Sequence, residues 1–170
     1  WTAISPRSIT AVLILIIVLV GIVEGSGIAG GADSHGYISQ ADPDFYFGAG
    51  VLKTLFPEAT LIASAPTVKK IQATLPAKLQ VWGPRLGANA PTDVPVPEVM
   101  TGNTIMLEGQ ALEVRGLDDA LPHRSYVWIP SLKAIVGGVN VFAGLHVWTA
   151  DTQSAQVRAN WSRKLDAMAA

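Results

Sequence analysis

The stretch that decides the fold is Ser39-Gln40-Ala41-Asp42-Pro43-Asp44-Phe45-Tyr46-Phe47-Gly48. Its Asp-Pro step is typical of a turn, and the residues that follow it indicate entry into a helix. The carboxylates of Asp42 and Asp44 are good ligands for a divalent metal. The amide of Gln40 is a poor ligand, and the phenyl ring of Phe45 cannot coordinate a metal. The stretch therefore resembles a metal-binding turn that has lost part of its ligand set.

This turn and the residues around it resemble the metallo-β-lactamase fold superfamily. There a strand ends in a His-x-His-x-Asp-His turn, and one subgroup reads roughly Ser-His-Gly-Asp-Pro-Asp-Tyr-Tyr-Phe-Gly at this point. The resemblance covers about residues 37–170, because further matches follow in the same order. They are Phe56-Pro57-Glu58-Ala59, Trp82-Gly83-Pro84, Leu107-Glu108-Gly109-Gln110, Val136-Gly137-Gly138 and Gly144-Leu145-His146-Val147-Trp148-Thr149-Ala150-Asp151.

The expected fold class is α+β, because strands in hairpins are followed by a helix that packs back on them. The resemblance implies an αββα sandwich. Its N-terminal half is expected to be incomplete, because the strand before the turn is cut short by the Gly-rich residues 30–36. We therefore divide the chain into an N-terminal segment, residues 1–36, and a metallo-β-lactamase-like domain, residues 37–170.

Residues 9–23 form an apolar run in which only Thr10 is polar. One interpretation is a secretory signal or a short membrane anchor, although a bilayer span takes about 20 residues. The other is one or two buried strands, which also read as continuous apolar runs. The first interpretation would place the protein outside the cytoplasm, and the second inside it. Contact with a membrane is expected only through this run.

The composition fits one domain and excludes several classes of partner and site. The chain has 170 residues, of which 49% are hydrophobic and 15% are charged, so it can bury a core of its own. Its net charge is −1 and its basic residues are scattered, so no nucleic-acid partner is expected. It has no cysteine, which excludes disulfides, thiolate ligands and a cysteine nucleophile.

Prolines and apolar spacing predict the elements after the turn. Pro57 ends one helix and Pro66 begins another, whereas the prolines between Leu79 and Pro97 indicate an extended surface loop. Asp151 is the expected N-cap of the last helix. The predicted helices are Ala49–Phe56, Thr67–Leu75 and Thr152–Ala169, the last with Val157, Trp161, Leu165 and Met168 on a buried face. The predicted strands are Thr60–Ala63, the hairpins Thr104–Leu107 with Ala111–Val114 and Tyr126–Ile129 with Ala134–Val136, and Val139–Phe142.

Asp44 is the only ligand-type position in the turn that keeps the expected residue. Those positions hold Gln40, Asp42, Asp44 and Phe45. The resemblance implies that Asp44 would bind the second metal and position the attacking water. The alternative is a turn aspartate that caps the helix starting at Ala49. Asp42 would supply an oxygen ligand or open the turn, and Gln40 is interpreted as a hydrogen-bonding remnant.

Two histidines are the remaining candidates. His123 precedes the Tyr126 strand near the place of a superfamily ligand, and it is either a metal ligand or an ordinary surface histidine. Asp118 and Asp119 are alternative oxygen donors in the same loop. His146 is either a general acid or base or a half-buried histidine bonded to backbone. A bridging Asp would be expected where Val139 stands, which limits the site to one ion at most.

The resemblance implies a hydrolase-like protein with a degenerate metal site. It would hydrolyse an ester, lactone or amide by metal-activated water, with Asp44 and His146 as catalytic residues. Asp44, Asp42 and His123 would hold zinc or another divalent metal. The alternative is a non-catalytic module that binds a small ligand beside Phe45 and Trp148 without metal. In both cases the partner is a small molecule.

Overall fold

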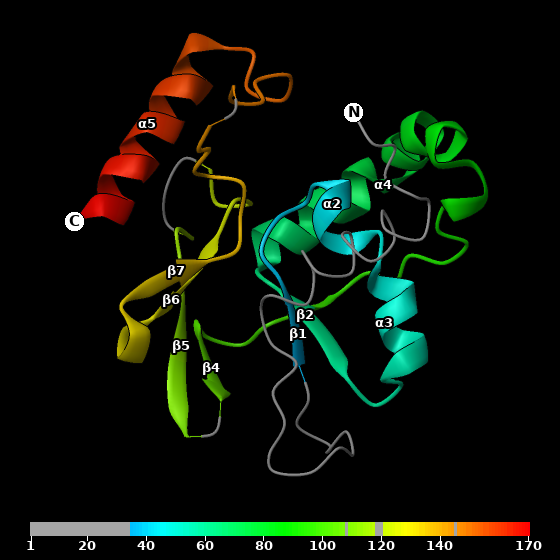
Figure 1. Cartoon of the computed structure of the whole chain (residues 1–170), viewed down its shortest axis with the longest axis horizontal. Helices are drawn as coiled ribbons and strands as arrows, with labels where there is room; N and C mark the ends of the chain where they lie inside the picture. Colours follow the sequence, from blue (N-terminus) through cyan, green and yellow to red (C-terminus); the bar gives the residue numbers. More distant parts are fainter. Residues whose placement is uncertain (1–34, 108, 118–120, 145) are drawn as a thin grey trace.

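The computed structural model describes residues 35–107, 109–117, 121–144 and 146–170 (Figure 1). The apolar run of residues 9–23, Asp118 and Asp119 lie outside the described residues. The described chain is mixed helix and strand with two separate sheets, so the predicted α+β class is confirmed. Within these ranges, no helix has both the length and the apolar character needed to cross a lipid bilayer.

The first sheet is parallel, with strand order β1-β2-β3. Parallel neighbours need crossover connections, and helices supply them here (Figure 1). The strands are β1 (His35–Ile38), β2 (Thr60–Ala63) and β3 (Glu98–Val99). The connections contain α2 (Pro43–Tyr46) and α3 (Ala49–Leu55), then α4 (Ala65–Leu86) and the 3-10 turn η1 (Gly87–Asn89). The turn of residues 39–42 therefore leaves the carboxyl end of β1.

The second sheet is an antiparallel meander, with strand order β4-β5-β6-β7. Both predicted hairpins are confirmed by its pairing. Its strands are β4 (Thr104–Leu107), β5 (Gln110–Arg115), β6 (Tyr126–Ile129) and β7 (Ala134–Val136), with the 3-10 turn η2 (Pro130–Leu132) between the last two.

Two apolar clusters give the layer order helix, sheet, sheet. Alternation along β1 sends Ile38 into the cluster on the helical side and Tyr37 into the cluster between the sheets. On the helical side, Phe45 and Tyr46 of α2 pack with residues of α4. Between the sheets, Tyr37 packs with Val114 and Val127 of the second sheet. The first sheet is thus covered on both faces.

Helix α4 differs from the prediction, because it begins at Ala65 and continues to Leu86. The prediction of an extended loop from Leu79 is therefore wrong for its first eight residues, which are helical. Pro76 and Pro84 lie inside the helix. Each proline removes only one helical hydrogen bond, and packing of an apolar face offsets that loss. The residues of that face are Val68, Ile71, Leu75, Leu79, Trp82 and Leu86, spaced three or four apart.

The C-terminal part also differs from the prediction. Residues 139–142 form no strand, because Gly137 and Gly138 turn the chain at positive φ. Helix α5 spans Ala155–Ala169, and its N-cap is Ser154, whose Oγ accepts a hydrogen bond from Val157 N at 3.2 Å. Asp151 does not cap it. Trp161 is buried as predicted, whereas Leu165 is 37% exposed.

Candidate functional site

Ser39 joins three segments that are far apart in the sequence. Its carbonyl oxygen accepts hydrogen bonds from Ser125 N at 3.1 Å and Ser125 Oγ at 2.8 Å. Its own Oγ accepts one from Gly138 N at 3.0 Å. Beside it, Gln40 forms an antiparallel bridge with Arg124. The turn after β1, the loop before β6 and the turn after β7 therefore meet at one place.

One face of α4 lies along the turn after β1 and the loop before β6. Thr67, Lys70, Thr74 and Lys78 are spaced by three, four and four residues, so they share a helix face. Thr67 Oγ1 donates to the carbonyl oxygen of His123 at 3.5 Å. Two to three turns further on, Lys78 reaches Asp42. The helix thus contacts both segments that carry candidate ligands.

Asp42 is bound to a lysine and does not cap the helix that follows it. It occupies the N-cap position of α2, but its side chain makes no capping hydrogen bond. Its Oδ1 lies 3.2 Å from Lys78 Nζ, and both side chains are 29% exposed. The carboxylate at this ligand-type position therefore already has a cationic partner.

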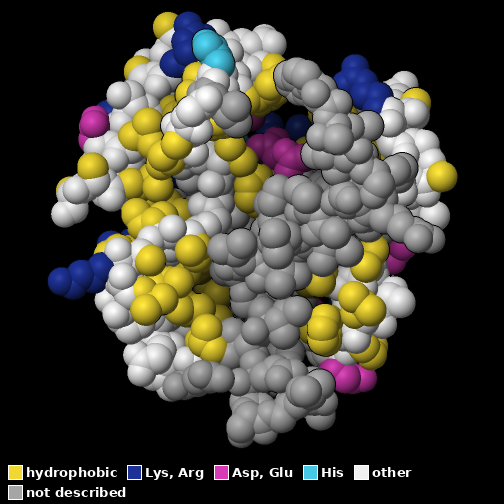
Figure 2. Space-filling model, viewed as in Figure 1, with side chains coloured by type: hydrophobic (Ala, Val, Ile, Leu, Met, Phe, Trp, Pro, Cys, Tyr) yellow, Lys and Arg dark blue, Asp and Glu magenta, His cyan; other side chains and the backbone are white. Residues whose placement is uncertain are grey.

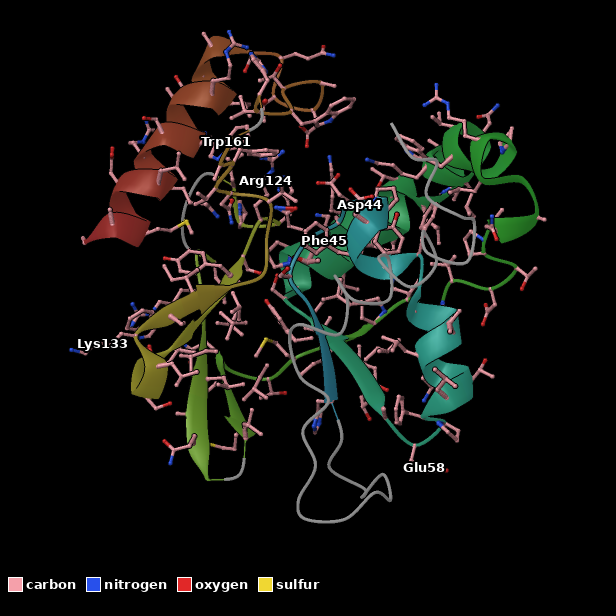
Figure 3. All side chains as sticks on the ribbon, viewed as in Figure 1. Asp44, Phe45, Glu58, Arg124, Lys133 and Trp161 are labelled. Atoms are coloured by element: carbon pink, nitrogen blue, oxygen red, sulfur yellow. The ribbon has the colours of Figure 1, made fainter. Side chains whose placement is uncertain are left out.

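Asp44 is solvent-exposed and does not cap α3, where Gly48 holds the N-cap position. Nearby protein atoms still desolvate it enough to raise the pKa of its carboxyl, and the Asp42 carboxylate adds to this while Lys78 opposes it. Water screens these effects because the side chain is open to solvent. Figure 2 shows acidic side chains at a hollow in this face, with Lys or Arg side chains beside them, where Figure 3 labels Asp44.

His123 is half-buried in the loop beside α4. Burial lowers the pKa of its imidazole most, and the charges of Lys70, Arg124 and Lys164 lower it further. The Asp42 carboxylate opposes them. At neutral pH the ring is therefore uncharged, which is the form that binds a metal or accepts a proton.

Two residues close to Asp42 in the sequence carry buried polar atoms without partners among the described residues. Gln40 is fully buried, and neither its Oε1 nor its Nε2 has a hydrogen-bond partner among the described residues. The hydroxyl of Tyr46 is also buried and also lacks a hydrogen-bond partner among the described residues. Burial raises the pKa of Tyr46 to about 12, and the Asp42 carboxylate adds to this. Buried polar atoms are normally satisfied, so these atoms have unused capacity for water or a ligand.

His146 and Trp148 are not brought to this site by any described contact. His146 is exposed, and its Nδ1 bonds the carbonyl oxygen of Val147 at 2.8 Å. Trp148 is 61% exposed, whereas Phe45 is buried in the helical-side cluster. The lining expected from Phe45 and Trp148 together therefore has no support in the described contacts.

Sequence reasoning missed two buried cations behind the His123 loop. Arg124 forms an ion pair with Asp151 and lies over the Trp161 ring at 4.8 Å (Figure 3). Lys164 Nζ donates to the carbonyl oxygens of Gly116 at 3.2 Å, Leu121 at 2.9 Å and Arg124 at 2.6 Å. The position of Lys164, three residues after Trp161, was the available signal. These contacts hold the loop against α5.

The described residues show no complete ligand set for a metal ion. Among residues 35–170, with the gaps given above, no three His, Cys, Asp or Glu side chains are grouped so that they could hold one. Of the four ligand-type positions, Asp42 is paired with Lys78, and two hold the buried amide of Gln40 and the buried ring of Phe45, which leaves the carboxylate of Asp44. Structural and catalytic zinc sites use at least three protein ligands. We therefore derive no metal-dependent step.

A cavity of about 560 Å³ lies elsewhere, between the turn after β7 and the end of α5. Its lining is mostly apolar and includes Ile135, Leu165 and Met168. The Asn140 amide belongs to the same lining, but its polar atoms are buried beneath Gly138. None of the candidate residues of the turn or of the His123 loop lines this cavity.

Comparison of the chain with protein-family models, with curated proteins and with solved structures gives no match.

Proposed function

We propose that this chain is a metallo-β-lactamase-like protein, related to hydrolases, whose degenerate metal centre binds a small polar molecule without a metal ion. The resemblance in the sequence is supported by the junction at Ser39. The resemblance assigns ligand positions to the turn after β1, the loop before β6 and the turn after β7, and these segments meet there. This convergence does not follow from the local sequence of any one segment.

The observation that carries ligand binding is the set of unpartnered polar atoms at Gln40 and Tyr46. A buried amide offers donors and an acceptor, and a phenol offers one of each. Leaving such groups unpaired costs about 1–3 kcal/mol each, which a polar ligand would recover. The ligand that fits is therefore a small molecule with both donors and acceptors, such as an amide, whereas a lactone offers acceptors only.

Ligand binding can be tested by calorimetric titration of the purified protein with small amides and lactones, with and without a chelator. Gln40→Leu removes the buried amide, and Gln72→Leu is a matched control on the exposed side of α4. We expect wild type and the control to bind with the same affinity in both conditions. We expect Gln40→Leu to weaken binding at least about tenfold. Binding that disappears with chelator, or that survives Gln40→Leu, would refute the proposal.

Hydrolysis of an ester, lactone or amide with one divalent metal is the second candidate. It is favoured by the exposed carboxylate of Asp44 and the uncharged imidazole of His123, which are both good ligand types. Metal analysis and turnover of a chromogenic ester test it, with wild type compared with Asp44→Ala. Stoichiometric zinc or manganese and turnover, both lost in Asp44→Ala, would support it. Trace metal in wild type would reject it.

A further inference from the structure

We infer that the ammonium group of Lys78 takes the place of the metal ion in this centre, as a positive charge that the chain itself supplies. The inference rests on the proposed metal-free function and deepens it. The carboxylates of Asp42 and Asp44 stand at ligand-type positions, and the first of them is paired with a cation. In the described residues, Lys78 is the cation that contacts one of them.

The geometry places this ammonium directly against the carboxylate of Asp42. Lys78 Nζ lies 3.2 Å from Asp42 Oδ1, in a pair of which each side chain is 29% exposed. An ion pair with this degree of burial is screened less than one on the surface. The contact also spans the fold, because it joins the turn after β1 to the middle of α4.

The same charge acts on the second carboxylate. Burial raises the pKa of the Asp44 carboxyl most, the Asp42 carboxylate adds to this, and the Lys78 ammonium opposes both as the smallest of the three effects. The ammonium therefore contacts Asp42 and acts more weakly on Asp44. The remaining charged groups near this cluster belong to Lys70 of α4 and to Arg124 and Lys164 behind His123, and they act on His123.

The register of α4 explains why Lys78 can occupy this place. Lys78 follows Thr74 by one turn on the face of α4 that lies along the turn and the His123 loop. The helix continues through Pro76, so Lys78 lies on a rigid element. Asp42 stands at the N-cap position of α2, but its side chain pairs with Lys78 and makes no capping hydrogen bond.

This role predicts that a divalent cation and Lys78 exclude each other. Lys78→Met removes the ammonium and keeps an apolar stem, so Asp42 loses its cation and a divalent ion can approach Asp42 and Asp44. Carboxylate oxygens bind Mn²⁺ well, and a ligand that binds only the folded state raises the unfolding temperature. Lys69→Met is the matched control, because Lys69 is exposed on the same helix.

The experiment is Mn²⁺ titration of the full chain, followed by calorimetry and by thermal unfolding. We expect Lys78→Met to bind Mn²⁺ at least about tenfold more tightly than wild type and Lys69→Met. The double variant that combines Lys78→Met with Asp44→Asn should lose this gain in Mn²⁺ affinity. If Lys78→Met fails to fold, Lys78→Gln carries the same test. No gain in either variant would overturn the inference, and so would Asp44-dependent Mn²⁺ binding by wild type.

The failure of this inference can be told apart from the failure of the proposed function. Ligand binding is read in wild type and Gln40→Leu without added metal. The role of Lys78 is read from Mn²⁺ binding without any organic ligand. If wild type binds the organic ligand but Lys78→Met gains no affinity for Mn²⁺, the proposed function stands and the inference about Lys78 is rejected.

Discussion

At the scale of single residues, the surroundings of Asp44 disfavour the ionised form of its carboxyl group. Desolvation and the Asp42 carboxylate raise its pKa above the ordinary value, so the folded state binds this proton more tightly than the unfolded chain does. The ionised form therefore destabilises the fold at neutral pH, and protonation relieves this as the pH falls.

We predict that Asp44→Asn stabilises the protein at pH 7. The gain should be below about 1 kcal/mol, because the side chain is exposed and water screens its interactions. Urea unfolding of wild type, Asp44→Asn and the exposed control Asp166→Asn measures it. A clear loss of stability in Asp44→Asn alone would contradict this account of the charge.

For His123 we predict that the free energy of unfolding changes with pH in the direction opposite to the effect of Asp44. Its folded-state pKa lies below the ordinary value of 6.5, so the unfolded chain binds the proton more readily. Stability is then complete above pH 6.5 and falls as the pH drops below it. Urea unfolding at pH 7.5 and 5.5 should show this loss in wild type and in the exposed control His146→Gln. His123→Gln should show a smaller loss, and an equal loss in all three proteins would be inconsistent with a buried, uncharged His123.

At the scale of elements, two patterns in the sequence of α4 predict different secondary structures. Pro76 and Pro84 predict a loop, whereas the apolar spacing from Val68 to Leu86 predicts a helix. The structure follows the spacing, because a buried apolar face is continuous over six positions. The helix Ala49–Phe56, the strand Thr60–Ala63 and both hairpins had no such conflict and could be predicted locally.

Pro76 is therefore expected to destabilise α4. We predict that Pro76→Ala raises the free energy of unfolding by up to about 3 kcal/mol, because it restores one hydrogen bond and removes a clash. Pro66→Ala should change stability little, because Pro66 lies in the first turn, where no helical hydrogen bond is lost. Circular dichroism during urea unfolding measures both variants. A loss of stability in Pro76→Ala would show that the proline supports the helix.

At the scale of the whole molecule, the two sheets meet where the candidate site lies. Asp42, Asp44 and His123 could be named from the sequence, because their types and motif positions are local features. Lys78 and Arg124 could not, because their roles come from contacts between distant segments. The sequence hinted at Lys164 only through its spacing from Trp161, and nothing in it indicated that the Tyr46 hydroxyl would be buried without a partner. His146 was named from its type and its neighbours, and its hydrogen bond within the described residues is to the adjacent carbonyl oxygen of Val147.

The contact between the sheets should be sensitive to Ser125. Tyr37 of β1 shares a hydrogen bond of 2.7 Å with Ser125 Oγ, and both residues are buried. Ser125→Ala leaves the Tyr37 hydroxyl unpaired, and we predict a loss of about 1–3 kcal/mol. The exposed Ser131→Ala is the matched control, and urea unfolding measures both. A loss no larger than that of the control would mean that this hydrogen bond does not hold the sheets together.

The most direct test of the central claim, a centre balanced by Lys78 and free of metal, is a crystal structure of the wild-type chain soaked in Mn²⁺. The claim predicts no anomalous peak between Asp44 and His123 and a hydrogen-bonded pair of Lys78 Nζ and Asp42 Oδ1. A manganese peak bound by Asp44 or His123, with Lys78 turned away from Asp42, would contradict it.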